Sequence, residues 1–295
     1  MKYLIIGATG NTGKAAAEEL LKQKLAVRVM GRSADKLAAL AAHGAEVFVG
    51  DVTDAKAVKG AFTGIDAAYV MIPPNLGASD FRKYQDEVTD CMCDAVATSG
   101  TKYIVSLSSV GANHASGVGP IAGLHYMEQQ LDGIPDLNTL HLRAGFFMEN
   151  LFGSLGMIKK MSIYGAACPA SSPWPLIATQ DIGHYAARRL SALNFSGKNQ
   201  QYLVGQRDIP GSEVALILGQ ALGVAPLPYV EFKYEEMKQG MIGAGLPEAA
   251  ADLFIELYQG FNNGLLDYHR DTESTTPTKL EDFAAQVLKP TYDVM

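Results

Sequence analysis

The sequence predicts an α/β protein with a Rossmann-type, doubly wound parallel sheet and a smaller C-terminal α/β lobe. Two observations carry this prediction. Short apolar runs alternate with helical patterns through the first half of the 295-residue chain, and a glycine-rich turn joins the first run to the first helical pattern. Strands that alternate with helices form parallel sheets, because each crossover returns the chain to the same end of the sheet.

Six apolar runs have the length and composition of strands, at residues 3–6, 26–30, 46–49, 67–72, 103–107 and 138–142. Apolar residues at helical spacing predict helices at 12–24, 33–43 and 81–98. Gly44 and Gly100 follow the second and third of these helices, where glycine suits the left-handed residue that ends a helix. The strands and crossovers together predict a Rossmann-type sheet.

The alternation weakens after about residue 150. Prolines at 169, 173 and 175, with Trp174 among them, predict a loop. Beyond it we expect helices at 181–193, 211–222 and 247–263 and short strands at 201–204 and 229–232. We therefore expect a Rossmann domain over 1–153, with 176–205 packed onto it, and a smaller substrate or cap lobe over 154–295. Such a lobe would close over the carboxyl edge of the sheet, where open α/β sheets bind ligands.

Composition and charge exclude several classes of protein. Apolar residues make up 48% of the chain and charged residues 19%, as in soluble globular proteins. A formal net charge of -7 argues against a general binder of nucleic acid or of anionic membranes. The spacing of Cys91, Cys93 and Cys168 fits neither a redox pair nor a zinc ribbon, so we expect reduced thiols, a cytoplasmic location and no metal site. No stretch approaches the roughly 18 apolar residues that span a membrane.

The turn after the first strand has the pattern of a dinucleotide-binding loop. Its glycines have distinct uses: Gly7 permits a tight turn, Gly10 lets the backbone approach a pyrophosphate, and Gly13 lets helix and strand pack closely. The helix that follows supplies oriented N–H groups for an anion. The alternative is a tight strand-to-helix turn without a ligand. We expect contacts to a nucleotide from Gly7, Thr9, Gly10, Asn11, Thr12 and Gly13.

The end of the second strand predicts NADP(H) as the preferred nucleotide over NAD(H). Sites for NAD place a carboxylate there, about 20 residues past the loop, whereas this chain has Arg32, which can bind a 2′-phosphate. Lys36 adds a second positive charge, although both could also be solvated charges at a helix start. Asp51 follows the third strand, beside Val52, and is placed either to accept from an adenine amino group or to cap the next helix.

The residues resemble the NmrA-like family of atypical short-chain dehydrogenase/reductases, proteins similar to quinone oxidoreductases. Besides the glycine loop and Arg32, the matching segments are 71–74 (MIPP), 106–111 (SLSSVG), 125–128 (HYME), 142–150 (LRAGFFMEN) and 181–183 (DIG). The resemblance spans nearly the whole chain. It implies a Rossmann domain with a small C-terminal lobe that binds NADP(H). It also implies either reduction of quinone-like substrates or use of the bound nucleotide as a redox signal.

The chain departs from classical short-chain dehydrogenases at their catalytic pair. Those enzymes use Tyr-x-x-x-Lys, in which the lysine lowers the pKa of the tyrosine so that its hydroxyl can exchange a proton. Here Tyr126 is followed four residues later by Gln130, whose neutral amide cannot act in that way. A quinone tolerates this loss, because it spreads the charge of the incoming hydride over a ring and can take protons afterwards from water.

Three residues remain as catalytic candidates. Ser108 follows the fifth strand, as a substrate-binding serine would, and Tyr126 lies at a suitable distance along the chain. His125 could hydrogen-bond a substrate carbonyl or donate a proton, because imidazole titrates near neutrality. The alternative is that His125 pairs with Glu128 on one face of a helix.

The ends of the other strands provide further candidates. We expect Met71, Ile72 and Pro73 to pass beneath the nucleotide, Ser106 to lie at its edge, and Phe146 and Phe147 to form a wall at the nicotinamide. Tyr164 and Trp174 are expected to line a substrate pocket. The alternative for the apolar residues is an ordinary core position. Cys91 and Cys93 are expected to lie in the middle of a helix and to pack against neighbouring side chains, with redox sensing as the alternative.

The sequence therefore predicts an NADPH-dependent oxidoreductase that passes hydride to a small flat acceptor such as a quinone, without a Tyr-Lys pair. The alternative from another class is a non-catalytic NADP(H) sensor that regulates a protein partner. No basic patch or DNA-reading motif supports binding to nucleic acid, and no segment supports binding to a membrane. A homodimer and a regulatory protein partner both stay open.

Overall fold

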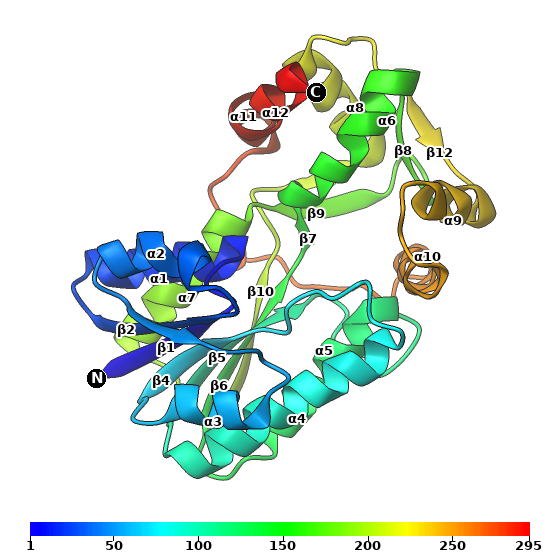
Figure 1. Ribbon diagram of the computed structural model, residues 1–295. Helices are drawn as coiled ribbons and strands as arrows, with labels where there is room; N and C mark the ends of the chain where they lie inside the picture. The colour runs from blue at the N-terminus through cyan, green and yellow to red at the C-terminus, as the bar shows by residue number, and fades with distance from the viewer.

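A computed structural model describes all of residues 1–295. The protein is built around one large parallel sheet (Figure 1). Its strands are β1 (Lys2–Ile6), β2 (Ala26–Gly31), β3 (Glu46–Val49), β4 (Ala67–Val70), β5 (Tyr103–Ser109), β6 (Asn138–Ala144) and β10 (Lys198–Leu203). They lie in the order β10-β6-β5-β4-β1-β2-β3, and every neighbouring pair is parallel. This confirms the predicted fold class, and the first six strands begin within one residue of their predicted positions.

Helices cover both faces of the sheet, as Figure 1 shows. One face carries α1 (Asn11–Lys22), α2 (Ala34–Ala42) and α7 (Thr179–Ala192), and the other carries α3 (Ala55–Phe62), α4 (Phe81–Ser99) and α5 (Ala122–Asp132). Successive residues of β1 enter opposite cores: Tyr3 and Ile5 pack toward the α1 and α7 face, and Leu4 and Ile6 toward the other face. We call this sheet, these helices and the segments that join them within residues 2–144 and 179–203 the first lobe.

Two elements of the first lobe come late in the sequence. Helix α7 packs along α1, and β10 extends the sheet beside β6. Gly183 permits this helix packing, because a Cβ there would lie 2.5 Å from the Cβ of Ala15 and 2.6 Å from the carbonyl oxygen of Thr12. The carboxylate of Asp181 accepts from the backbone and hydroxyl of Thr278, which ties α7 to the C-terminal segment. The DIG segment therefore seats α7 against the first turn of α1.

The second lobe is formed by two small sheets and the remaining helices. Its strands are β7 (Phe146–Phe147), β8 (Tyr164–Ala166), β9 (Pro173–Ile177), β11 (Asp208–Pro210) and β12 (Tyr229–Glu231). Its helices are η2 (Met148–Ser154), α6 (Leu155–Met161), α8 (Gly211–Leu222), α9 (Tyr234–Gly243), α10 (Glu248–Asn262), α11 (Leu280–Phe283), η3 (Ala284–Leu288) and α12 (Lys289–Val294). The sheets are β11-β9-β7 and β12-β8, over a separate apolar core. None of the helices combines the length and apolar character that crossing a lipid bilayer requires.

The prediction of a loop across residues 169–175 is wrong in its last three residues, which begin β9. Pro173, Trp174 and Pro175 pair with β11 on one side, whereas β7 pairs with Leu176 and Ile177. The prolines therefore lie where β9 has a neighbouring strand on one side only. A proline N, which has no hydrogen to donate, can face the unpaired side there without loss of a hydrogen bond to a second strand. Proline density gave a false loop signal.

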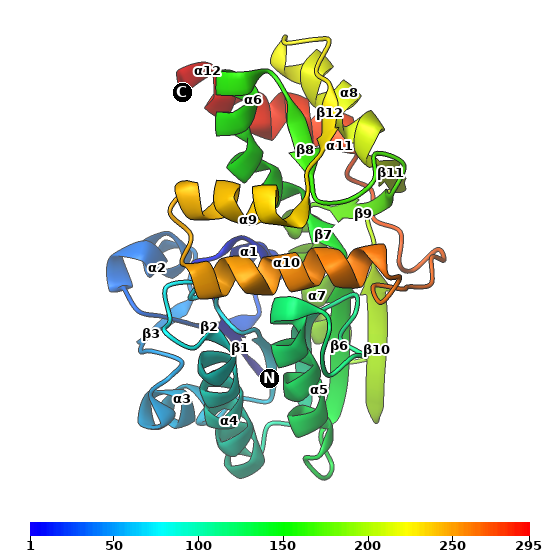
Figure 2. The same ribbon diagram turned by 90° about the vertical axis from the view of Figure 1, so that its right-hand side faces the viewer.

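Helix α10 is the one long helix of the second lobe that lies against the first lobe. In Figure 2 it crosses the ends of α4 and α5, with α9 above it. It contacts the short helix η1 (Gly119–Ile121), which precedes α5. The segment between β5 and α5 therefore lies at the contact between α10 and the first lobe.

Candidate functional site

The turn between β1 and α1 needs its glycines for steric reasons. Gly7 has φ +74°, in the left-handed region, and a Cβ there would lie 2.7 Å from the sulfur of Met71. The amide of Gly10 donates to the carbonyl of Gly7 over 2.9 Å, which closes the turn. A Cβ on Gly13 would lie 2.4 Å from the same carbonyl oxygen. The close packing of β1, the turn and α1 thus leaves no room for a side chain at Gly7 or Gly13.

The N-terminus of α1 is open to an anion. Its N-cap residue, Gly10, has no side chain to bind the first amides, and the first turn contains no acidic residue. Thr9, Gly10 and Asn11 are exposed, so the positive end of the helix dipole faces solvent. These observations fit a bound pyrophosphate. The Thr12 side chain does not take part, because its hydroxyl is buried and accepts from Tyr69 over 3.0 Å; only its backbone amide remains for the nucleotide.

Arg32 lies beside the glycine turn and is free to bind a ligand. A Cβ on the preceding Gly31 would come 3.3 Å from the Thr9 methyl, so β2 ends against the turn. Arg32 is exposed and forms no ion pair within 4.0 Å, and Lys36 is exposed in the first turn of α2. Arg28, in contrast, is buried: it donates to Glu46 and to two carbonyls at the end of α3.

Asp51 forms a turn with Thr53 and does not cap a helix. Its carboxylate accepts from the Thr53 amide over 3.0 Å and the Thr53 hydroxyl over 2.8 Å. These bonds, helped by the nearby Arg32 guanidinium, hold the pKa of Asp51 below its usual value despite partial burial. Asp54 caps α3 instead, so the helix-cap alternative for Asp51 is wrong. Val52 follows at the same edge and is half-buried.

Tyr84 is a site residue that the sequence analysis missed. It lies in the first turn of α4, and its hydroxyl donates to the carbonyl of Pro73 over 2.8 Å. Burial and the nearby Asp51 raise its pKa, whereas Arg32 lowers it, so these three residues share one region. The tyrosine therefore anchors the segment after β4, in which Met71 reaches Gly7 and Ile72 is buried. The sequence signal that could have identified Tyr84 was an aromatic residue in the first turn of the helix that follows β4.

Both serines of β5 that were singled out as candidates are engaged inside the protein. Ser106 is fully buried and hydrogen-bonds Nδ1 of His141 over 2.6 Å, which removes it from the nucleotide edge. The hydroxyl of Ser108 donates to Glu128 over 2.6 Å. Glu128 also accepts two hydrogen bonds from Arg143, at 3.0 and 2.6 Å. Ser108 is therefore part of a buried charged network and is not placed to hold a substrate.

His125 is oriented by the segment between β5 and α5. Its Nδ1 lies 2.8 Å from the carbonyl oxygen of Ala112, which can only accept, so Nδ1 carries a proton. In the neutral ring, Nε2 then holds the lone pair. The alternative pairing with Glu128 is wrong, since that carboxylate binds Arg143 and Ser108.

Tyr126 is turned toward α4 and is not free to act as a proton donor. Its hydroxyl donates to the Asp90 carboxylate over 2.9 Å, and the Arg82 guanidinium lies 5.3 Å from its ring centre. The hydrogen bond to Asp90, with burial and the negative charge beside it, raises the pKa of Tyr126. A classical catalytic tyrosine needs the opposite shift.

An aromatic cluster of the second lobe lies just beyond the end of β6. Phe146 packs on Trp174 with 4.6 Å between ring centres and on Phe261 with 5.6 Å, and Trp174 lies 4.8 Å from Phe261. Phe147 packs against the core of the first lobe. Tyr164 does not belong to this cluster, because it is buried in the core of the second lobe against Tyr229. Its expected place in a substrate pocket is therefore wrong.

The cysteines lie in packed positions. Burial and neighbouring carboxylates raise the pKa of Cys91, and the same causes raise the pKa of Cys93 to about 12. Burial raises the pKa of Cys168 to about 11. Redox sensors need the thiolate form, so these shifts favour packing over sensing. No group of three or more His, Cys, Asp or Glu side chains is arranged to hold a metal ion.

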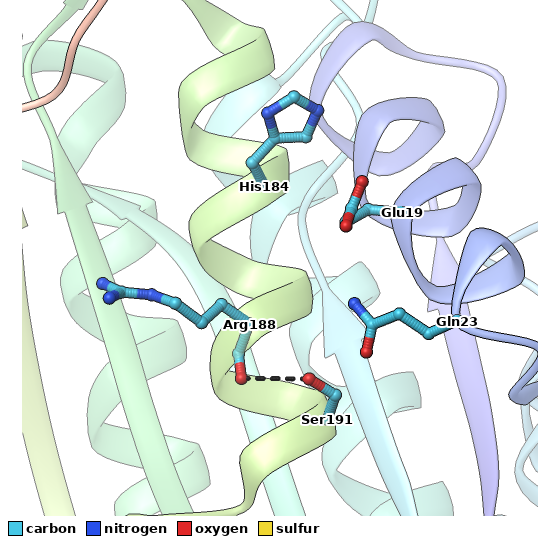
Figure 3. A pocket seen from close by; sticks show the side chains of 5 residues that line it. All are labelled: Glu19, Gln23, His184, Arg188 and Ser191. Atoms are coloured by element: carbon cyan, nitrogen blue, oxygen red, sulfur yellow. Dashed lines mark hydrogen bonds between the residues drawn. The ribbon is translucent and has the colours of Figure 1, made fainter.

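A polar groove of about 340 Å³ lies elsewhere, between α1 and α7 (Figure 3). It is lined by Glu19, Gln23, His184, Arg188 and Ser191, and the Ser191 hydroxyl donates to the Arg188 carbonyl over 3.2 Å. Glu19 lies in the last turn of α1 and Gln23 just beyond it, at the opposite end of that helix from the glycine turn. No hydrophobic residue lines the groove, and none of the predicted site residues does.

Known proteins are similar to this chain in sequence or in fold. A family model described as NAD(P)H-binding matches residues 7–131. An NAD(P)H azoreductase of Xenophilus azovorans is 31% identical over 262 residues, which cover 86% of this chain and 85% of the relative. The structure of an NADPH-dependent quinone oxidoreductase from Escherichia coli in complex with NADPH has a TM-score of 0.83 at 21% identity, covering 98% and 100% of the two chains.

A Citrobacter triphenylmethane reductase in complex with NADP(H) has the same fold, with a TM-score of 0.76 at 20% identity over 97% of this chain and 99% of the other. The glycine turn at the open end of α1 lies inside the matched NAD(P)H-binding region, and the azoreductase relationship extends well into the second lobe. The chain therefore belongs to the NAD(P)H-binding, NmrA-like family of atypical short-chain dehydrogenase/reductases that includes this azoreductase.

Proposed function

We propose that this protein is an NADPH-dependent oxidoreductase that transfers hydride to a small flat acceptor such as a quinone. The observation that carries the proposal is the uncapped N-terminus of α1 beside the unpaired Arg32 guanidinium. A free helix terminus and a free guanidinium are the groups that bind a pyrophosphate and a 2′-phosphate. The 31% identity to an NAD(P)H azoreductase supports a redox activity for the same site.

The residues around the turn would hold the nucleotide as follows. The turn from Gly7 through Thr9 and Gly10 to Asn11, Thr12 and Gly13 would bind the pyrophosphate through backbone amides. Arg32 and Lys36 would bind the 2′-phosphate, and Asp51 and Val52 would face the adenine. Met71, Ile72 and Pro73 would lie beneath the nucleotide, and Phe146 and Phe147 beside the nicotinamide. When bound, the nicotinamide would supply the hydride.

The preference for NADPH rests on charge. Arg32 lies near Asp51 but forms no ion pair within 4.0 Å, so a 2′-phosphate would give its guanidinium a charged and geometrically matched ligand. NADH offers only a hydroxyl at this place. We infer that NADPH binds more tightly for this reason.

The polar groups of the site favour an acceptor that does not need a proton during hydride transfer. Ser108 and Tyr126 both donate to carboxylates of the protein, so neither is free to protonate a developing alkoxide. A quinone avoids this need, because its ring spreads the negative charge and protons can follow from water. His125 can donate from Nε2 only when its ring is protonated, because Nδ1 is already bound to Ala112.

The test is oxidation of NADPH by the purified protein with a panel of quinones, with NADH as the control. Nucleotide binding is measured by calorimetry in the same samples. We expect turnover that is faster with NADPH than with NADH. Binding of NADPH without turnover across the panel would overturn the proposal and would favour a sensor that acts on a protein partner.

A further inference from the structure

Helix α10 is held against the segment between β5 and α5 by close backbone packing and one hydrogen bond. A Cβ on Gly119 would lie 2.0 Å from the Leu253 carbonyl oxygen, and one on Gly260 would lie 2.4 Å from the Gly117 carbonyl oxygen. The Glu256 carboxylate accepts from the Gly117 amide over 2.8 Å. Among the side chains of α10, only Glu256 hydrogen-bonds to the first lobe.

This segment also orients His125. The carbonyl of Ala112, five residues before Gly117, binds Nδ1 of the imidazole over 2.8 Å. Val110, Ala112, Val118 and Ile121 form one small apolar core, onto which Leu257 and Phe261 of α10 pack. A displacement of α10 would therefore disturb the segment that holds the imidazole in place.

The C-terminal half of α10 contacts the aromatic cluster at the end of β6. Phe261 lies 5.6 Å from Phe146 and 4.8 Å from Trp174, and Tyr258 lies 6.3 Å from Trp174. Helix α10 thus contacts the residue beside the nicotinamide position as well as the segment that orients His125. Figure 2 shows the helix in this bridging position.

We propose that Glu256 is a positioning residue for the acceptor. Its hydrogen bond to Gly117 fixes α10 against the first lobe and thereby sets the spacing between the aromatic cluster and His125. Glu256 is half-buried, and a carboxylate that accepts from an amide away from bulk water forms a strong bond. This role rests on the proposed function, because it assigns the space between cluster and imidazole to a flat acceptor.

The kinetic test compares Glu256→Ala with Glu256→Gln, with 1,4-naphthoquinone as the acceptor. Alanine removes the bond, whereas the glutamine amide oxygen can still accept from Gly117. We expect Glu256→Ala to raise KM for the quinone about tenfold, equivalent to about 1.4 kcal/mol, with an unchanged Kd for NADPH. Glu256→Gln should recover most of this loss. Gln259→Ala is the matched control, since Gln259 is exposed on the same helix and its side chain forms no hydrogen bond.

A second measurement does not depend on turnover. Trp174 is the only tryptophan of the chain and packs against Phe261, so its fluorescence reports the seating of α10. Glu256→Ala should increase quenching of Trp174 by acrylamide at temperatures where circular dichroism shows a folded protein. Glu256→Gln and Gln259→Ala should match the wild type.

The two measurements separate the outcomes. If Glu256→Ala matches Gln259→Ala in Trp174 quenching, the hydrogen bond does not seat α10 and the inference fails, whether or not quinones are reduced. If quenching changes but KM for the quinone does not, Glu256 has a structural role only, which also overturns the inference. Failure of the wild type to oxidise NADPH would refute the proposed function, and the quenching would still show whether Glu256 seats α10.

Discussion

The ion pair between Arg143 of β6 and Glu128 of α5 permits a quantitative prediction. The two side chains are only 9% and 4% exposed, and two hydrogen bonds of 3.0 and 2.6 Å join them. Ser108 adds a third donor to the carboxylate. The Glu128 partner keeps the pKa of Arg143 raised even though burial alone would lower it. Arg143→Ala would leave a buried carboxylate with one neutral donor.

Breaking a buried pair on one side costs about 3–5 kcal/mol, because the remaining charge stays desolvated without its partner. At about 2 °C per kcal/mol for a chain of this size, Arg143→Ala should lower Tm by about 6–10 °C. The double variant Arg143→Met/Glu128→Leu removes both charges and fills similar volume. It should lie within about 2 kcal/mol of the wild type, since an apolar pair often replaces a buried ion pair without net loss.

Urea denaturation followed by circular dichroism measures these free energies of unfolding. Arg188→Ala is the control, because its pair with Glu273 has 60% and 57% exposed side chains at 3.2 Å and should contribute less than about 1 kcal/mol. A loss below about 1 kcal/mol in Arg143→Ala, equal to that control, would refute the reasoning. So would a double variant less stable than the single one.

Four further changes have distinct expected outcomes. Arg32→Ala should weaken NADPH binding about 10- to 100-fold in calorimetry, because a hydrogen bond to a charged group contributes about 1.5–3 kcal/mol, and should leave NADH binding nearly unchanged. Equal losses for the two nucleotides would show that Arg32 does not bind the 2′-phosphate. Gly13→Ala should cost about 1–3 kcal/mol in denaturation and also weaken NADPH binding, because backbone lies 2.4 Å from the new Cβ; a stable variant with normal Kd would contradict this. Tyr126→Phe should keep quinone turnover within about twofold, since its hydroxyl is bound to Asp90, and a collapse of kcat would restore the tyrosine as a catalyst. Burial alone would raise the pKa of Asp132, but hydrogen bonds from His141 and Thr139 outweigh it and lower this pKa, so the carboxylate stabilises the fold above its unfolded pKa and loses this effect as pH falls through its folded pKa. Asp132→Asn should therefore reduce the loss of unfolding free energy at acidic pH, as measured by denaturation at a series of pH values. An unchanged pH dependence would show that Asp132 does not contribute to it.

The first lobe could be predicted from sequence because its signals are local. Alternation of strand and helix patterns fixes the parallel sheet, and the glycine turn is defined by three close approaches within one loop. Arg32 was also accessible to such reasoning, because it directly follows a strand whose position is clear. These features depend on neighbours in the chain, so a single sequence contains them.

The sequence does not show which distant group a side chain binds. Ser108 has the right position for catalysis, but Glu128, 20 residues later, takes its hydrogen bond. Tyr126 follows the right strand, but Asp90 on another helix holds its hydroxyl. Tyr164 was expected to line a substrate pocket, but the pairing of β8 with β12 brings Tyr229 against it. No local pattern reveals these pairings, because each depends on how two elements pack.

These pairings bear on the chemistry as well as the fold. A site that reduces ketones must keep a polarised hydroxyl unpaired until the substrate arrives, because a donor already bound to a carboxylate would have to give up a charge-assisted hydrogen bond in order to serve an alkoxide. Here the serine and the tyrosine that could have done so are held by Glu128 and Asp90. The remaining candidate groups are the glycine turn at the open end of α1, the His125 imidazole with one free nitrogen, and the aromatic cluster around Phe146. Under the proposed function, these groups would orient a flat, delocalised acceptor whose charge needs no immediate proton.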